Sequence, residues 1–167
     1  MNKLVDKYSE EIEKILNKYP ADQRNSALMP LLYLAQRENG YVDNHAMDDI
    51  AKILEISRTE ISSLIGFYTL YHDEPAGKVR IQVCTDLPCA LRGADQFLHD
   101  LCQVLDIRPG ETTKDGLITI EEVKCLAACD KAPIFQSQTG KGLEYHENMT
   151  VEKTLDWINL WRDSNTS

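Results

Sequence analysis

The sequence lacks the features that mark several classes of protein. It has no run of 18 consecutive apolar residues, so we expect no transmembrane helix and no direct membrane insertion. Its first 20 residues alternate charged with single apolar residues and lack the apolar segment of a secretory signal, which favours a cytoplasmic location. Basic residues are few: 18 Lys and Arg against 27 Asp and Glu give a net charge of -9. Such a surface repels polyanions, and we therefore expect no nucleic acid partner.

Several enzyme motifs are also absent. No G-x-G-x-x-G or other phosphate-binding glycine loop occurs, so the chain carries no recognisable site for a dinucleotide or a flavin. No C-x-x-C occurs, which argues against a thioredoxin-like dithiol oxidoreductase. The four histidines are scattered and form no H-E-x-x-H motif. We expect each histidine to be a surface or packing residue, and we assign no catalytic residue.

The first 75 residues predict a bundle of short helices. The chain as a whole has the composition of a globular protein, with 43% hydrophobic and 27% charged residues. In this first part, apolar residues recur at helical spacing. We expect Ser9 to cap the first helix and Asn44 to cap the third, while Ser57 and Glu60 form a capping box at the fourth.

The pattern changes at residues 74–77, Glu-Pro-Ala-Gly, which predict a domain boundary. We therefore divide the chain into residues 1–75 and residues 76–167. The second part mixes strands and helices in the order strand, helix, strand, strand, helix, in which Pro88 opens a helix continuing to Leu105 and Thr150 caps the last helix. The predicted fold class is α+β, a helical bundle followed by a small α/β domain of thioredoxin-like type.

Three aromatic residues precede the boundary, at positions Phe67, Tyr68 and Tyr71. We expect them to pack in the core of the bundle. The alternative is an interface role, because aromatic residues often anchor protein–protein interfaces.

Four of the five cysteines form two pairs. Cys84 and Cys89 have four residues between them, Cys125 and Cys129 have three, and 35 residues separate the pairs. Each pair falls where a predicted strand meets a loop, and loops at strand ends can converge in space. Four thiolates suit an iron–sulfur cluster or a structural zinc ion. A disulfide is the weaker alternative because the chain lacks a secretory signal. The fifth, Cys102, lies on the apolar stripe of a predicted helix, and we expect a buried structural thiol.

The residues around both pairs resemble a known family. The stretch 81–94, which reads IQVCTDLPCALRGA, and the stretch 125–133, which reads CLAACDKAP, are similar to the thioredoxin-like 2Fe–2S subunit of respiratory complex I, the NuoE family. The helical part is similar through residues 27–36 and 66–70. The resemblance covers roughly residues 15 to 162.

The resemblance implies a ligand set and a function. Cys84, Cys89, Cys125 and Cys129 would hold one 2Fe–2S cluster, which would exchange single electrons with the FMN of a partner flavoprotein subunit (NuoF-like). The helical half would dock on that partner, which carries FMN and the NADH site, within a wider NADH dehydrogenase complex, the NADH:quinone oxidoreductase. The chain would then act as one subunit of the enzyme without oxidising NADH alone. Its location would be cytoplasmic, or peripheral on the cytoplasmic face of the inner membrane.

Two alternative functions stay open at this stage. An equivalent subunit serves soluble NAD-dependent hydrogenases and formate dehydrogenases, and a zinc-bound, non-redox interaction module is an alternative of another class. The chain also departs from the family at Ala127, where glycine is common. If that position requires a positive φ, we expect strain in the loop between Cys125 and Cys129.

Overall fold

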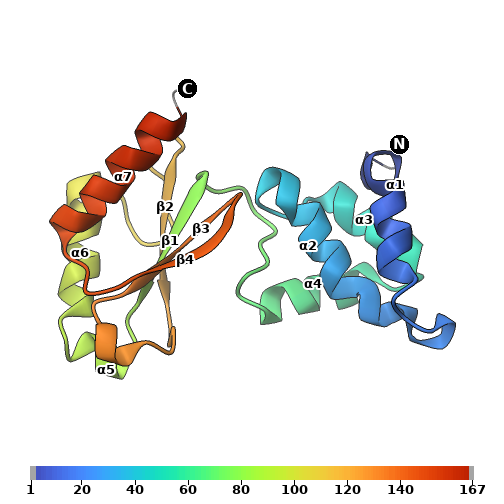
Figure 1. The fold of residues 1–167 in the computed structure, drawn as a ribbon, viewed down its shortest axis with the longest axis horizontal. Coiled ribbons are helices and arrows are strands. Elements are labelled where there is room, and N and C mark those ends of the chain that lie inside the picture. Colours follow the sequence, from blue (N-terminus) through green and yellow to red (C-terminus); the bar gives the residue numbers. More distant parts are fainter. Residues whose placement is uncertain (1–2, 166–167) are drawn as a thin grey trace. The chain divides into compact units, whose positions relative to one another are not determined.

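The computed structural model describes residues 3–165. The chain divides into two compact units, Met1–Pro75 and Ala76–Ser167. The described part of the first unit is helical without strands, and the second unit combines a four-stranded sheet with helices (Figure 1). This composition confirms the predicted α+β class.

The first unit is built from short helical segments around one apolar core. In chain order, these segments are α1 (Lys3–Leu16), the 3-10 helix η1 (Ala21–Ala27), α2 (Leu28–Asn39), α3 (Asn44–Leu54) and α4 (Arg58–Phe67). Leu31, Ile50 and Ile61 are fully buried where α2, α3 and α4 meet. Helices this short depend on such packing for their stability.

The helix caps agree with the sequence at one site and differ by one residue at another. The capping box is confirmed: Glu60 N–H donates to Ser57 Oγ at 3.2 Å, and Ser57 N–H donates to the Glu60 carboxylate at 2.9 Å. The predicted cap Asn44 is wrong. Asp43 caps α3, accepting the Ala46 N–H at 2.7 Å, because its backbone is extended while Asn44 is already helical.

The predicted start of the first helix at Ser9 is also wrong. Helix α1 already includes Lys3, and a non-helical backbone at Tyr8 bends it instead of ending it. The extra turns form because Leu4 is buried in the core of the bundle, where its N–H donates to the Asp49 carboxylate at 3.3 Å. This long-range contact has no local signal in the sequence.

The second unit is a mixed sheet with helices on one face. Its elements are β1 (Val79–Cys84), α5 (Leu87–Ala90), α6 (Ala94–Leu105), β2 (Ile118–Val123), the 3-10 helix η2 (Cys129–Lys131), β3 (Phe135–Thr139), β4 (Gly142–His146) and α7 (Val151–Asn165). The strand order is β2-β1-β3-β4, in which β1 and β2 are parallel and the other pairs are antiparallel. Figure 1 shows α6 and α7 on the same side of the sheet.

Strand alternation separates an apolar face from a polar face. Ile81 and Val83 in β1 lie in the core formed with α6 and α7. Gln82 and Cys84 alternate with them and therefore lie on the other face. There Gln82 is almost fully buried and donates to the Glu121 carboxylate of β2 at 2.8 Å. The polar face also carries the start of the cysteine site.

The predicted long helix from Pro88 to Leu105 is broken in two. Gly93 is the N-cap of α6 and has φ +89, a left-handed conformation that interrupts the helix between the single turn α5 and α6. Cys89 therefore lies on its own short turn. The predicted cap of the last helix is confirmed, because Thr150 Oγ1 accepts the N–H of Lys153 at 3.3 Å.

Candidate functional site

The parallel pairing of β1 and β2 brings the two cysteine pairs to one end of the sheet. Cys84 is the last residue of β1 and pairs with Val123, the last residue of β2. Parallel strands have their carboxyl ends at the same edge, so Cys125, two residues past β2, emerges beside Cys84. The hydrogen bond from Thr85 N–H to the Val123 carbonyl, 3.0 Å long, continues this alignment beyond the strands.

The first pair is buried. Cys84 and Cys89 are each 1% exposed and lie in a small apolar cluster with Ala94, Ala132 and Ile134. The short helix α5 places Cys89 there, because its N–H donates to the Asp86 carbonyl at 2.8 Å.

The second pair lies nearer to solvent. Cys125 is exposed and Cys129 is half-buried at the start of η2. Between them, Ala127 has φ +58, so the left-handed conformation anticipated at this position is present. The Ala127 N–H donates to Cys125 Sγ at 3.4 Å, so the positive end of this peptide dipole points toward the sulfur.

The thiols act on one another electrostatically. Burial is the main cause that raises the pKa of the Cys89 thiol to about 12. The pKa is raised further by a hydrogen bond between Cys89 and Cys84 and by the charges of Cys84, Cys129 and Cys125. Burial also raises the pKa of Cys129, with the neighbouring Cys125 and Cys84 adding to the shift. Leu126 and Ala128, which lie between Cys125 and Cys129, pack against the cluster that holds Cys84 and Cys89, so the second pair lies next to the first. Metal binding there must displace protons from the thiols.

The donor set has the chemistry of a soft metal site. Four thiols on two segments of the chain match the ligands of a 2Fe–2S cluster, and they also match those of a zinc ion. Among residues 3–165, no group of three or more His, Cys, Asp and Glu side chains surrounds one point as ligands of a single ion would. A 2Fe–2S cluster distributes its four thiolates over two iron atoms, so its ligands need not surround one point.

Three basic residues close to the cysteines in sequence each have a partner. Arg92 Nε donates to the Ala132 carbonyl at 3.1 Å, Lys124 pairs with Glu122 at 2.9 Å, and Lys131 Nζ lies 3.8 Å from the carboxylate of the adjacent Asp130. The first of these bonds ties the segment after α5 to the segment after η2. Arg92 therefore links the parts of the chain that follow each cysteine pair.

Cys102 lies apart from this group. It is buried on α6 within the core that faces the sheet, and burial raises its pKa. The prediction of a buried structural thiol is confirmed.

The aromatic residues before the domain boundary are not all core residues. Phe67 is 76% exposed and Tyr68 is 41% exposed, so the expectation of core packing is wrong for both. Tyr71 is half-buried and donates through its hydroxyl to the Met29 carbonyl at 3.0 Å. Met29 and Tyr71, with the 65% exposed Tyr33, line a hollow of about 330 Å³. The sequence pattern did not reveal this surface because the spacing of these residues also fits a buried face.

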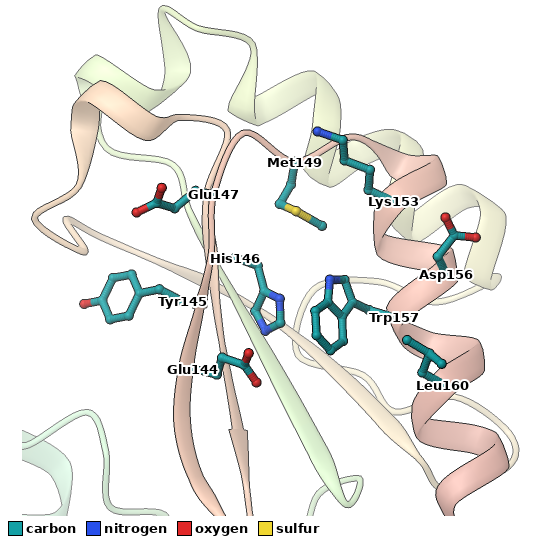
Figure 2. Close-up of a pocket in the computed structure, with 9 residues that line it drawn as sticks. All are labelled: Glu144, Tyr145, His146, Glu147, Met149, Lys153, Asp156, Trp157 and Leu160. Atoms are coloured by element: carbon teal, nitrogen blue, oxygen red, sulfur yellow. The ribbon is translucent and has the colours of Figure 1, made fainter.

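A second cavity, of about 400 Å³, lies between β4 and α7 (Figure 2). None of its lining residues is a cysteine. His146 lies at its base, 4% exposed, with its Nε2 2.9 Å from Ser137 Oγ and its ring stacked on Phe135. His146 is therefore a packing residue, as predicted for the histidines.

Comparison with known proteins identifies relatives that match most of the chain. The chain is 41% identical over 144 residues to a subunit of the NADH-quinone oxidoreductase of Rhizobium meliloti, covering 86% of this chain and 82% of that protein. It is 38% identical over 125 residues to NADH-quinone oxidoreductase subunit 2 of Thermus thermophilus, covering 75% and 69%. It is also 39% identical to the mitochondrial NADH dehydrogenase (ubiquinone) flavoprotein 2 of Dictyostelium discoideum, covering 89% and 59%.

Solved structures show the same fold in a larger protein. An NAD+-reducing NiFe-hydrogenase in the air-oxidised state matches with a TM-score of 0.66 at 17% identity, over 82% of this chain and 23% of that chain. No helix within residues 3–165 combines the length and the apolar character needed to cross a membrane. The family described as thioredoxin-like 2Fe-2S ferredoxin matches residues 12–162, and the chain therefore belongs to this family.

Proposed function

We propose that this chain is an electron-transfer subunit of an NADH:quinone oxidoreductase. The observation that carries the proposal is the placement of the second cysteine loop at the carboxyl ends of β1 and β2, where Leu126 and Ala128 pack against the cluster that holds Cys84 and Cys89. The relatives at 38% and 41% identity, whose names are those of this complex, support it.

The four cysteines are proposed as the ligands of one 2Fe–2S cluster, which supplies one-electron chemistry when bound. Cys84 and Cys89 hold the buried side, where apolar neighbours exclude water. Cys125 and Cys129 hold the side nearer to solvent. A partner's redox group can approach Cys125 most closely, because this is the most exposed of the four thiols.

The proposed partner is a flavoprotein subunit that carries FMN and the NADH site. The helical unit would dock on it through the exposed residues Tyr33, Phe67 and Tyr68. Exposed aromatic side chains of this size are typical anchors of protein–protein interfaces. Within the wider complex, the chain would lie peripherally on the cytoplasmic face of the membrane.

Two other functions predict different partners or metals. The likeness to the NAD+-reducing hydrogenase is one of fold, at 17% identity, so it does not favour the hydrogenase over the respiratory complex. Neither the site nor the relatives reported above favour the assignment to a formate dehydrogenase. A zinc-bound interaction module would need the same four thiols but would show no redox signal.

The test is purification of the tagged chain from its own cells without crosslinking. We expect a flavoprotein with bound FMN and membrane-arm subunits of a quinone-reducing complex to co-purify. Recovery with a nickel–iron or molybdenum subunit instead would contradict the respiratory assignment. A Phe67→Asp variant should lose the flavoprotein, whereas Leu160→Asp, a matched change at an exposed apolar residue of α7, should retain it.

A further inference from the structure

One peptide group in the second cysteine loop is hydrogen bonded on both sides. The Tyr145 hydroxyl donates to the Leu126 carbonyl at 3.1 Å. The N–H of the same peptide group, carried by Ala127, donates to Cys125 Sγ at 3.4 Å. A continuous path of hydrogen bonds therefore runs from a phenol through a peptide to a sulfur.

The fold places Tyr145 at this position. Tyr145 pairs with Gln136 across β3 and β4, which puts its side chain on the polar face of the sheet, the face that also carries Cys84. Figure 2 shows Tyr145 and His146 on opposite sides of β4. Tyr145 is the one tyrosine in residues 76–167, so no other phenol of this unit can take its place.

The left-handed backbone of Ala127 completes the path. Its φ of +58 turns the N–H back toward Cys125, at a conformational cost that an alanine must bear. The Tyr145 bond fixes the opposite end of the same peptide plane. The two hydrogen bonds together hold this loop in the conformation in which the Ala127 N–H points at Cys125 Sγ.

These contacts have an electrostatic consequence. A donor to the carbonyl polarises the peptide group and strengthens its N–H as a donor, because hydrogen bonds in a chain reinforce one another. Hydrogen bonds to ligand sulfurs favour the more negative, reduced state of an iron–sulfur cluster and so raise its reduction potential. We propose that Tyr145 is a positioning residue that raises the reduction potential of the cluster through the Leu126–Ala127 peptide. This inference rests on the proposed function, since Cys125 must be a cluster ligand.

The first test is Tyr145→Phe in the full-length chain carrying its cluster. Redox titration with dithionite, followed by EPR, measures the midpoint potential. We expect unchanged iron and sulfide content and a more negative midpoint. At the potential where half of the wild-type cluster is reduced, the ratio of reduced to oxidised cluster should fall roughly threefold, which is about 30 mV at about 59 mV per tenfold. Tyr41→Phe, a matched change at a half-buried tyrosine of the helical unit, should leave the midpoint unchanged.

A second variant gives a shift of opposite sign. Incorporation of 3-fluorotyrosine at position 145 makes the phenol a stronger donor while preserving its shape. We expect a more positive midpoint, measured at a pH where the phenol keeps its proton. A merely structural role of Tyr145 would not reverse the sign between the two variants. If Tyr145→Phe binds less iron than the wild type, the fluorotyrosine protein alone decides the question.

The outcomes separate this inference from the proposed function. A wild-type chain without iron, sulfide or an EPR signal would overturn both. A normal wild-type cluster whose midpoint is unmoved by fluorotyrosine would overturn the role of Tyr145 alone. Shifts of opposite sign in the phenylalanine and fluorotyrosine proteins would support it.

Discussion

Cys84 and Val123 are paired residues at the carboxyl ends of two parallel strands. This pairing explains how cysteines far apart in sequence become neighbours. Strand β1 ends in Cys84, and the chain leaving β2 reaches Cys125 two residues after Val123. With antiparallel strands, the same two cysteines would lie at opposite ends of the sheet.

Replacing an exposed ligand should remove the cluster without unfolding the chain. We predict that Cys125→Ser loses most of its iron and sulfide, because a serine hydroxyl is a poor substitute for a thiolate on iron. The helical unit should keep its circular dichroism, since it has its own core. Equal iron and sulfide contents in this variant and the wild type would refute the ligand assignment.

Replacing the remaining cysteine gives the matched control. Cys102 lies on α6 in the apolar core that faces the sheet, in a different cluster from the buried candidate ligands Cys84 and Cys89. We predict that Cys102→Ser retains iron and sulfide but loses about 1–3 kcal/mol of stability, because a hydroxyl is placed among apolar side chains. Metal analysis and urea denaturation measure the two effects. Loss of the cluster from a variant that stays folded would overturn the assignment of ligands.

The strained residue of the second loop gives a prediction about stability. Ala127 has φ +58, and glycine adopts this conformation without a steric cost. We predict that Ala127→Gly stabilises the metal-free second unit by about 1 kcal/mol in urea denaturation. The neighbouring Ala128 has φ -131, so Ala128→Gly should destabilise the same loop. Destabilisation by both changes would mean that the loop is not strained at Ala127.

A pair of variants can show which residue, Asp43 or Asn44, is the N-cap of α3. Asp43 accepts the Ala46 N–H, whereas the side chain of Asn44 accepts a surface hydrogen bond from the Arg58 guanidinium. We predict that Asp43→Ala costs about 1 kcal/mol of stability and that Asn44→Ala costs less. Urea denaturation followed by far-ultraviolet circular dichroism measures the difference. The reverse order would show that Asn44 is the functional cap.

The buried histidine predicts how stability depends on pH. Burial lowers the pKa of His146 below its ordinary value, while the charge of Glu144 opposes this shift. The unfolded chain therefore binds a proton at pH values where the folded chain does not, so stability falls as the pH drops below about 6.5. We predict a lower urea midpoint at about pH 5.5 than at about pH 7.5.

Two variants isolate the contribution of His146. His146→Gln should flatten the decline in the urea midpoint, because it removes the group that titrates differently in the two states. The exposed His99 offers a control, and His99→Gln should keep the decline. Parallel pH profiles for the wild type and His146→Gln would disprove the role of burial at this residue.

The parts of the fold that the sequence predicted correctly have local causes. The capping box at Ser57 and Glu60 and the cap of the last helix at Thr150 are each encoded within a few residues. The errors have causes that local patterns do not contain. Helix α1 extends before Ser9 because Leu4 reaches a distant core, and Gly93 breaks the helix expected from Pro88 by adopting a positive φ.

The candidate site could be predicted as a set of four cysteines, because their spacing is visible in the sequence. The hydrogen bond from Tyr145 to Leu126 could not, since it joins residues 19 positions apart through a strand pairing. The exposure of Phe67 could not be predicted either, because helical spacing does not tell a buried face from a binding face.

The most direct test of the central claim is the metal content of the purified chain, measured together with EPR of the dithionite-reduced protein. Four thiolates sharing one cluster predict two iron atoms and two acid-labile sulfides for each chain, with a paramagnetic signal on reduction. Stoichiometric zinc, with no sulfide and no signal, would contradict the claim.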